Sequence, residues 1–288
     1  MGHVNVGEGV RLAWRAWGEG STTVAFIHGN LASKEWFELV ARRLPRDLRV
    51  IGFDWRGCGD SDRPEPGPNY ANYAMERHAA DMLEGLDALG VGRCHLITHS
   101  TGGYIAALME LAAPGRFPRI LDLDPVSPKG MAFDAAGRAV FEAMKSAKAV
   151  TRAVMASAAP TLFDPSSLTQ GRAPAFLDPK SELARFYDRI VDQTFGVSDG
   201  VWLGTPFHLD RASATGGLTA RMGEMKAERL IVWGEQDLWI PQADVEAMAA
   251  GLPNARLVKV PGVGHSMNLE APDLFAGFVG AHLGGAAL

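Results

Sequence analysis

A serine at the apex of a sharp turn is the residue of this sequence with the clearest chemical potential. The segment 98–103, THSTGG, places Ser100 between an apolar run over 94–97 and a run with helical spacing over 104–113. A strand, a tight turn and a helix, with serine at the apex, is the setting in which a G-x-S-x-G-type motif marks a nucleophile. One departure is Thr98, which stands where this motif usually carries glycine. The spacing predicts a nucleophile elbow at Ser100.

A serine hydroxyl becomes a good nucleophile when a base takes its proton and a third group holds that base. Two later segments could supply these partners. His265 lies in a glycine-flanked loop after the strand-like run 256–260, and Asp237 follows the apolar run 230–233. Because the carboxyl ends of parallel strands meet at one crevice of an open sheet, we expect Ser100, Asp237 and His265 to converge.

Other carboxylates compete with Asp237 for the role of the acid that orients the histidine. Glu235 lies two residues before it, and Asp122 and Asp124 lie at the end of the strand-like run 119–123. We prefer Asp237, because its loop matches the usual placement of the orienting carboxylate in a serine triad. Asp124, which a proline follows, is expected to cap or line the next turn.

Four motifs in the right order make the chain resemble the α/β-hydrolase superfamily over nearly its whole length. Besides the serine elbow and the histidine loop, these are the segment 26–30, FIHGN, and the segment 54–61, DWRGCGDS. The first looks like the oxyanion loop of the family, and the second like its D-x-R-G-x-G-x-S turn after the fourth strand. The chain is most similar to esterase-like or lactonase-like members with a serine nucleophile and a cap.

The resemblance implies roles for particular residues. Ser100 would be the nucleophile, His265 the base and Asp237 the orienting acid. The backbone N–H groups of Asn30 and Thr101 would form the oxyanion hole. The implied fold is α/β, with a mostly parallel eight-stranded sheet, helices on both faces and an inserted helical cap.

Hydrophobic periodicity predicts a similar organisation along the chain. Apolar and alternating runs predict strands, and 3.6-residue spacing predicts the helices between them; the strands are 10–17, 23–27, 49–53 and 119–123, and the helices are 35–44 and 73–89. Between about 127 and 225 the strands stop, and helical spacing appears at 133–147 and 181–195, around a proline-rich loop over 160–179. We therefore predict core segments at 1–126 and 226–288 and a helical cap at 127–225.

Composition limits the partners and the compartment. The chain has 288 residues, a formal net charge of −5 and a pI near 5.9. Without a basic field to attract phosphate, nucleic acid is not expected as a partner. Neither a signal peptide nor an apolar stretch of about 20 residues is evident, so no membrane partner is expected and the predicted compartment is the cytoplasm. Cys58 and Cys94 give no disulfide framework, and the oligomeric state, a homodimer included, stays open.

No cofactor or metal is expected. The sequence has neither of the common glycine-rich phosphate loops, and His95 and His99 lack a third ligand. His28 and His99 flank the predicted site and are expected to bond the loop backbone there. Among the aromatic and polar residues of the predicted cap, Trp202 and His208 are the candidates for substrate contact.

These features predict a cofactor-independent serine hydrolase that cleaves a small-molecule ester or lactone of moderate size and apolar character. Carbon–carbon bond hydrolases and amidases use the same triad and stay open, as do cofactor-free dioxygenases of this fold, whose acid would match Asp124. A non-catalytic small-molecule receptor is a further alternative, because fold does not fix function. Dehalogenases and epoxide hydrolases are excluded, since they need a carboxylate where this chain has Ser100.

Overall fold

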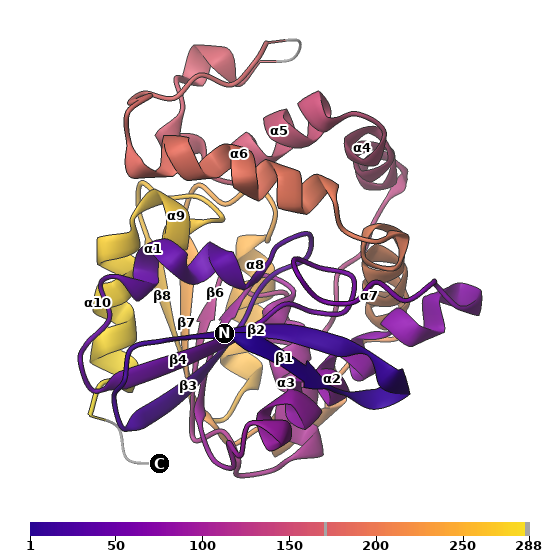
Figure 1. Cartoon of the computed structure of the whole chain (residues 1–288), viewed down its shortest axis with the longest axis vertical. Helices are drawn as coiled ribbons and strands as arrows, with labels where there is room; N and C mark the ends of the chain where they lie inside the picture. Colours follow the sequence, from indigo (N-terminus) through magenta and orange to yellow (C-terminus); the bar gives the residue numbers. More distant parts are fainter. Residues whose placement is uncertain (170–171, 286–288) are drawn as a thin grey trace.

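One eight-stranded sheet forms the centre of the computed structural model, which describes residues 1–169 and 172–285 (Figure 1). The strand order is β1-β2-β4-β3-β5-β6-β7-β8. β2 runs antiparallel to its neighbours β1 and β4, and all other pairings are parallel. This confirms the predicted sheet; its strands are β1 (Gly2–Asn5), β2 (Arg11–Trp17), β3 (Thr22–Ile27), β4 (Leu48–Phe53), β5 (His95–His99), β6 (Arg119–Leu123), β7 (Glu228–Gly234) and β8 (Ala255–Val260).

The parallel strands at the centre of the sheet are buried on both faces. In β5 and β6 every residue except Arg119 is buried, so polar residues such as Thr98 and Asp122 lie inside, and neither strand alternates between buried and exposed positions. Two groups of helices cover the sheet: α1 packs with α9 and α10, and α2 packs with α3, which also contacts β3 and β5. The bounds of the core helices are α1 (Glu38–Ala41), α2 (Met75–Ala88), α3 (Gly102–Ala112), α8 (Gln242–Gly251), α9 (Met267–Glu270) and α10 (Pro272–Leu283).

The helix predicted over 35–44 is shorter in the structure. A 3₁₀ turn, η2 (Lys34–Phe37), precedes the four-residue α1. The reason lies in the buried Asp54, whose Oδ1 accepts the Lys34 backbone N–H at 2.7 Å and whose Oδ2 accepts the Lys34 Nζ at 2.6 Å. The start of this segment is thus held by Asp54, which directly follows β4, in addition to the cap from Ser33, whose hydroxyl oxygen accepts the Glu35 N–H.

A helical segment between β6 and β7 lies above the sheet in the view of Figure 1. We call residues 127–225 the cap; that they form a separate domain stays a prediction. The predicted helices at 133–147 and 181–195 correspond to α4 (Ala135–Ser146) and α6 (Glu182–Phe195), while α5 (Lys148–Ser157) and α7 (Thr205–Ala214) were not predicted. Of the predicted loop 160–179, residues 170–171 lie outside the described residues, as do residues 286–288 of the second core segment.

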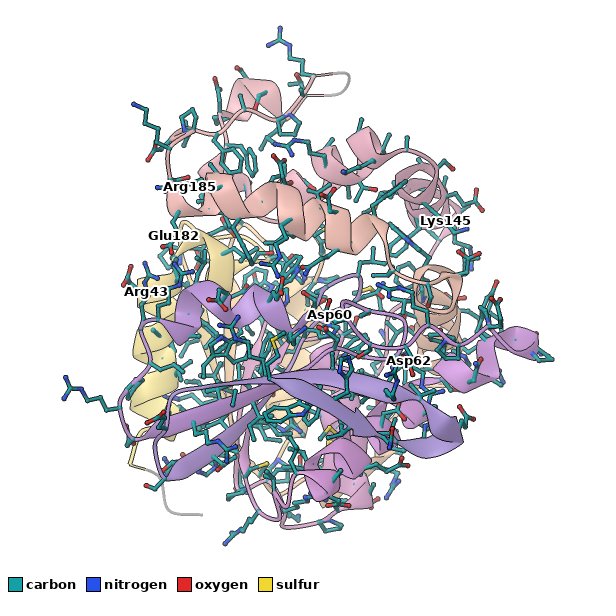
Figure 2. All side chains as sticks on the ribbon, in the orientation of Figure 1. Arg43, Asp60, Asp62, Lys145, Glu182 and Arg185 are labelled. Atoms are coloured by element: carbon teal, nitrogen blue, oxygen red, sulfur yellow. The ribbon has the colours of Figure 1, made fainter. Side chains whose placement is uncertain are left out.

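Charged side chains join the cap to the core at its edge. Glu182 at the start of α6 forms an ion pair with Arg42, and its Oε2 lies 3.9 Å from Nη2 of Arg43. These contacts connect α6 to the segment around α1 (Figure 2). No helix among the described residues is long and apolar enough to cross a membrane.

A buried ion network holds the central strands to α3. The Arg229 guanidinium on β7 donates to Asp122 Oδ2 on β6 and to Glu110 Oε2 on α3, each at 2.7 Å. All three side chains are at most 5% exposed. Because a buried charge without its counter-charge is costly, these groups stabilise the fold only as a set.

Replacing Arg229 is expected to destabilise the protein strongly. Arg229→Leu leaves two buried carboxylates without a counter-charge, and the free energy of unfolding should fall by about 3 kcal/mol or more. Urea unfolding followed by circular dichroism measures this change. The control is Arg221→Leu, which removes an exposed pair with Glu224 and should leave the urea midpoint nearly unchanged. Equal losses in both variants would contradict the role assigned to this network.

Candidate active site

Ser100 occupies a strained turn between β5 and α3. Its φ of 54° lies in the left-handed region, which costs a non-glycine residue about 1–3 kcal/mol. Three backbone hydrogen bonds hold it there: its N–H donates to the Leu123 carbonyl at 3.0 Å, and its carbonyl accepts the N–H groups of Gly103 and Val126 at 2.9 Å. Such strain persists only where the surroundings fix it, and the conformation presents the serine side chain to a cavity.

Two glycines allow the loop after β3 to press against this turn. A Cβ atom on Gly102 would lie 2.3 Å from the Ile27 carbonyl oxygen, and one on Gly29 would lie 2.9 Å from Cβ of Ser100. Both distances are too short for any side chain. The close approach brings Asn30, which directly follows Gly29, to the wall of the cavity that Ser100 also lines.

Thr98, which departs from the usual motif, has a structural task. Its hydroxyl donates to Asp122 Oδ1 at 2.6 Å, next to the Arg229 network, and its residue is fully buried. Glycine could not make this contact. Because Thr98 belongs to β5 and not to the turn, its side chain does not interfere with the strained backbone of Ser100.

His265 and Asp237 form a hydrogen-bonded pair beside the cavity. The Nδ1–H of His265 donates to Asp237 Oδ2 at 2.8 Å, and both side chains are buried. The other oxygen, Oδ1, accepts the backbone N–H groups of Trp239 at 2.6 Å and Ile240 at 3.1 Å. The carboxylate is therefore fixed as an acceptor on both sides. This fixes the tautomer of His265 and leaves its Nε2 free to take a proton.

Trp239 adds a second contact to the histidine. Its indole ring stacks on the His265 imidazole with centroids 5.6 Å apart and planes 12° apart. This stacked contact restricts the orientation of the imidazole ring. Sequence reasoning missed Trp239; its position two residues after Asp237 was the available signal.

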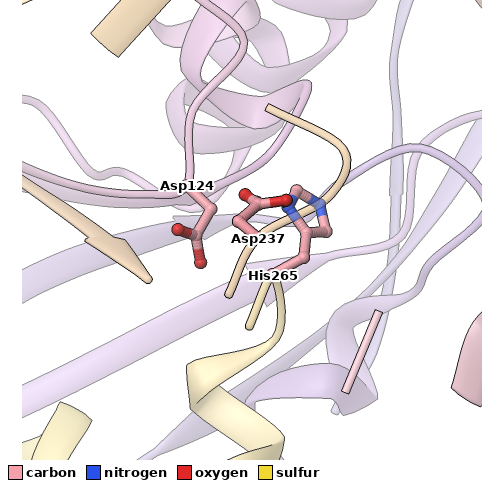
Figure 3. A group of neighbouring side chains, drawn as sticks. All are labelled: Asp124, Asp237 and His265. Atoms are coloured by element: carbon pink, nitrogen blue, oxygen red, sulfur yellow. Dashed lines mark hydrogen bonds and ion pairs between the residues drawn. The ribbon is translucent and has the colours of Figure 1, made fainter. Parts of the chain in front are cut away.

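Asp124, the competing acid, lies on the far side of Asp237 from the histidine ring as drawn in Figure 3. Its Oδ1 accepts the Gly234 N–H at 2.8 Å, and its buried Oδ2 has no hydrogen-bond partner among the described residues. Burial, together with the charge of Asp237, holds the pKa of Asp124 well above its ordinary value. The buried site of Asp124 thus favours its protonated form, while Asp237 bonds the histidine.

The atoms of Asp124, Asp237 and His265 also lie close enough to be compared with a metal site. One ligand atom from each of the three lies within 4.8 Å of the others. In this arrangement, however, both oxygens of Asp237 accept N–H groups, and Nδ1 of His265 carries the proton that Asp237 accepts. The donor set suits a proton-holding pair better than a cation.

Two further histidines bond the loops of the site and stay neutral. His28 Nδ1–H donates to the Gly29 carbonyl at 2.7 Å, and His99 Nε2–H donates to the His265 carbonyl at 2.9 Å. Burial lowers the pKa of His28 to about 4 and that of His99 to about 3. Each therefore serves as a fixed hydrogen-bond donor to a loop that carries a candidate site residue.

The predicted oxyanion donors lie at the wall of the cavity. Asn30 and Thr101 both line it, and within the described part of the chain their backbone N–H groups donate to no protein acceptor. Leu31, next to Asn30, has a φ of 58°, and its carbonyl accepts the hydroxyl of Thr194 on α6 at 2.7 Å. The cap thus helps to hold this loop, a role for Thr194 that the sequence did not reveal.

Glu270 ties the histidine loop to the cap in a similar way. Its Oε1 accepts the backbone N–H groups of Gly264 at 2.9 Å and Ser266 at 3.3 Å, on either side of His265. Its Oε2 accepts the hydroxyl of Thr161 in the cap. Sequence reasoning missed Glu270, because neither its helix nor its spacing marks it.

A cavity of about 60 Å³ lies over Ser100, between the sheet and the cap. Its walls are mainly apolar, and the cap contributes Met131, Phe133, Phe141, Met155, Ala158 and Leu209. The two predicted substrate contacts lie elsewhere. Trp202 is buried and faces a neighbouring cavity, and His208 Nε2–H donates to the Tyr70 carbonyl at 3.0 Å without lining this cavity.

Comparison with known proteins identifies the class of this chain. Residues 22–272 match the model of the alpha/beta hydrolase fold, and the chain belongs to this family. The dihydrolipoyllysine-residue acetyltransferase component of the acetoin cleaving system of Cupriavidus necator is 27% identical over 278 residues, which are 96% of this chain and 68% of that protein. The non-heme chloroperoxidase of Streptomyces lividans is 26% identical over 295 residues, which are 95% of this chain and 96% of that protein.

A solved structure gives a similar result. Est816, described as an N-acyl homoserine lactone degrading enzyme, superposes with a TM-score of 0.71 and 25% identity, over 97% of this chain and 99% of its own. These relatives have different activities on one fold. Membership in the family therefore establishes a hydrolase-type scaffold and leaves the substrate to be argued from the site.

Asp124→Asn is expected to stabilise the protein increasingly as the pH rises. The folded-state pKa of Asp124 is raised above its unfolded value, so between these values the folded state keeps a proton that the unfolded state has lost. Wild-type stability therefore falls as the pH rises through this window. Asparagine does not titrate and keeps the oxygen that Gly234 uses.

Urea unfolding at several pH values measures this effect. The stability difference between Asp124→Asn and wild type should grow as the pH rises above about 4, the pKa of an aspartate in an unfolded chain. Asp244→Asn, at a half-exposed position near the start of α8, shows what the removal of a carboxylate from the surface does. A stability difference between Asp124→Asn and wild type that does not grow with pH would contradict the raised pKa of Asp124.

Proposed function

We propose that the protein is a cofactor-independent serine hydrolase that cleaves a carboxylic ester or lactone of an apolar substrate through an acyl-enzyme. The observation that carries this proposal is the His265–Asp237 hydrogen bond of 2.8 Å beside a cavity that Ser100 also lines. The assignment of Ser100, His265 and Asp237 as a triad is part of the proposal.

The reaction would begin at the carbonyl carbon of the substrate. Ser100 Oγ attacks it while Nε2 of His265 takes the hydroxyl proton, and Asp237 stabilises the imidazolium that forms. The N–H groups of Asn30 and Thr101 would hold the oxyanion, a contribution of about 3–4 kcal/mol per donor in comparable sites. His265 then gives its proton to the leaving alkoxide and afterwards activates a water molecule, which releases the acid and frees Ser100.

Several features of the site support an apolar ester or lactone. The cap side chains over Ser100 are apolar, and among residues 1–169 and 172–285 no lysine or arginine lines the cavity. A pocket with apolar walls and few polar groups is the usual design for such a ligand. The similarity to Est816, whose description names a lactone, supports the lactone class as well.

The position of Asp124 bears on the dioxygenase alternative. That chemistry would use an acid at the end of β6 to support the histidine. Here His265 donates to Asp237, while Asp124 bonds the Gly234 backbone and has a raised pKa because it is buried beside Asp237. This arrangement supports hydrolysis. Hydrolysis of an amide or of a carbon–carbon bond needs the same three residues, Ser100, His265 and Asp237. Assays must therefore decide which kind of bond the protein cleaves.

Steady-state hydrolysis of p-nitrophenyl acetate, p-nitrophenyl butyrate and γ-butyrolactone tests the proposal. Wild type should hydrolyse at least one of these substrates, and Ser100→Ala should lose about 10³-fold or more in kcat. Asp237→Asn should lose about 10³–10⁴-fold in kcat, because the histidine is left in the wrong tautomer. Asp124→Asn should keep its rate within about threefold, because Asp124 bonds the Gly234 backbone and not His265, and asparagine keeps the oxygen that accepts this bond.

The Asp124→Asn and Asp237→Asn pair is the matched control, since both variants replace a buried carboxylate in the same cluster. A larger loss at Asp124 than at Asp237 would favour the dioxygenase-type arrangement. Full hydrolysis by a folded Ser100→Ala protein would contradict the proposed nucleophile.

A further inference from the structure

A second cavity, of about 220 Å³, adjoins the one over Ser100. It lies between α4, the π-helical turn η6 (Gly200–Gly204), α7 and the loop that carries Tyr70. Most of its walls are apolar or aromatic, with Trp202, Leu203 and Phe207 among them. The mechanism proposed for ester hydrolysis does not involve this cavity.

Two phenylalanine side chains separate the two cavities. Phe133 and Phe141 line both of them, with ring centroids 5.5 Å apart and planes at 90°. Both side chains are only partly buried, and Phe141 also meets Trp202 edge-on, with centroids 6.3 Å apart. Both cavities are therefore bounded by the same two partly buried side chains, and a change of their rotamers would alter the partition between the cavities.

The sizes of the cavities show why such an opening matters. The cavity over Ser100 measures about 60 Å³, far below the range of about 300–1,000 Å³ of pockets that bury a whole drug-sized ligand. With the second cavity of about 220 Å³ added, the space comes near the lower end of that range. The first cavity alone accommodates the reacting group, and the rest of a larger substrate needs the second.

The charges at the second cavity indicate which end of a ligand lies there. Arg138 and Glu142, both exposed on α4, are its charged lining residues, and Arg138 lies 3.4 Å from Asp210. The inner walls carry no formal charge. Such a site suits a chain that is apolar along its length, with its far end close to a polar rim.

We propose that this second cavity binds an apolar chain of the substrate, and that the Phe133–Phe141 partition opens to connect it with Ser100. This proposal rests on the proposed function, because it assumes that a carbonyl group lies over Ser100. It assigns the substrate class as an ester or lactone with an elongated alkyl or acyl chain. Each methylene buried in the second cavity should raise affinity about fourfold until the cavity is full.

Binding to the inactive Ser100→Ala protein tests the cavity without any hydrolysis. Isothermal titration calorimetry with 2-decanone and 2-butanone compares a long and a short ketone that cannot be hydrolysed. We expect 2-decanone to bind about 50-fold tighter or more. Adding Leu203→Trp, which fills the second cavity, should reduce the ratio of the two affinities at least about tenfold. Adding Val140→Ala on the exposed face of α4 should leave this ratio unchanged.

Equal affinity for the two ketones would overturn the proposal, and so would tight binding of 2-decanone by a folded Leu203→Trp protein. Phe141→Ala gives an independent measurement that does not depend on the tolerance of Leu203→Trp. It removes part of the partition and should tighten the binding of 2-decanone relative to 2-butanone, with Val140→Ala again as the control. An unchanged ratio in Phe141→Ala would also count against the proposal.

Hydrolysis by the active protein separates this proposal from the proposed function. The ratio of kcat/KM for p-nitrophenyl octanoate to that for p-nitrophenyl acetate should fall about tenfold in Leu203→Trp and stay the same in Val140→Ala. Hydrolysis of both esters with an unchanged ratio in Leu203→Trp would overturn the cavity proposal alone. Tight binding of 2-decanone by Ser100→Ala, with no ester hydrolysis by wild type, would overturn the proposed function and leave the cavity assignment standing.

Discussion

The hydrogen bond between Nδ1 of His265 and Oδ2 of Asp237 is the contact on which the rest of the site depends. A buried imidazole without this partner would be free to rotate or to carry its proton on the other nitrogen. The bond is itself supported, because Trp239 and Ile240 donate to the second oxygen of Asp237. Burial and the charge of Asp237 raise the pKa of Asp124, which disfavours a second negative charge in the buried cluster.

The cap forms hydrogen bonds with the loops that carry the candidate site residues. Thr194 on α6 holds the carbonyl of Leu31 in the loop that carries Asn30, and Glu270 links Thr161 of the cap to the backbone on both sides of His265. The cap thus contacts both the predicted oxyanion loop and the histidine loop. A ligand that shifts α6 or the segment around Thr161 therefore acts on the loops that carry the groups proposed to carry out the chemistry.

Sequence reasoning succeeded where the signal is local. The strands β3, β5, β6 and β7 each contain a run of buried apolar residues, and Asn30, Ser100 and Asp237 were predicted in the loops after β3, β5 and β7. Spacing could not distinguish Asp237 from Asp124, because both follow a strand; in the structure Asp237 accepts the His265 N–H, whereas Asp124 accepts the Gly234 N–H. Thr194 and Glu270 could not be found, since their partners, Leu31 and Thr161, lie more than a hundred residues away along the chain.

Intact mass spectrometry after treatment with a small fluorophosphonate tests most directly whether Ser100 is an activated nucleophile. Such a reagent forms a stable bond with a serine whose proton a neighbouring base removes. Wild type is predicted to gain the mass of one adduct, and Ser100→Ala is predicted to gain none. An adduct that persists in Ser100→Ala, or a folded wild-type protein that gains no adduct, would contradict the proposed chemistry.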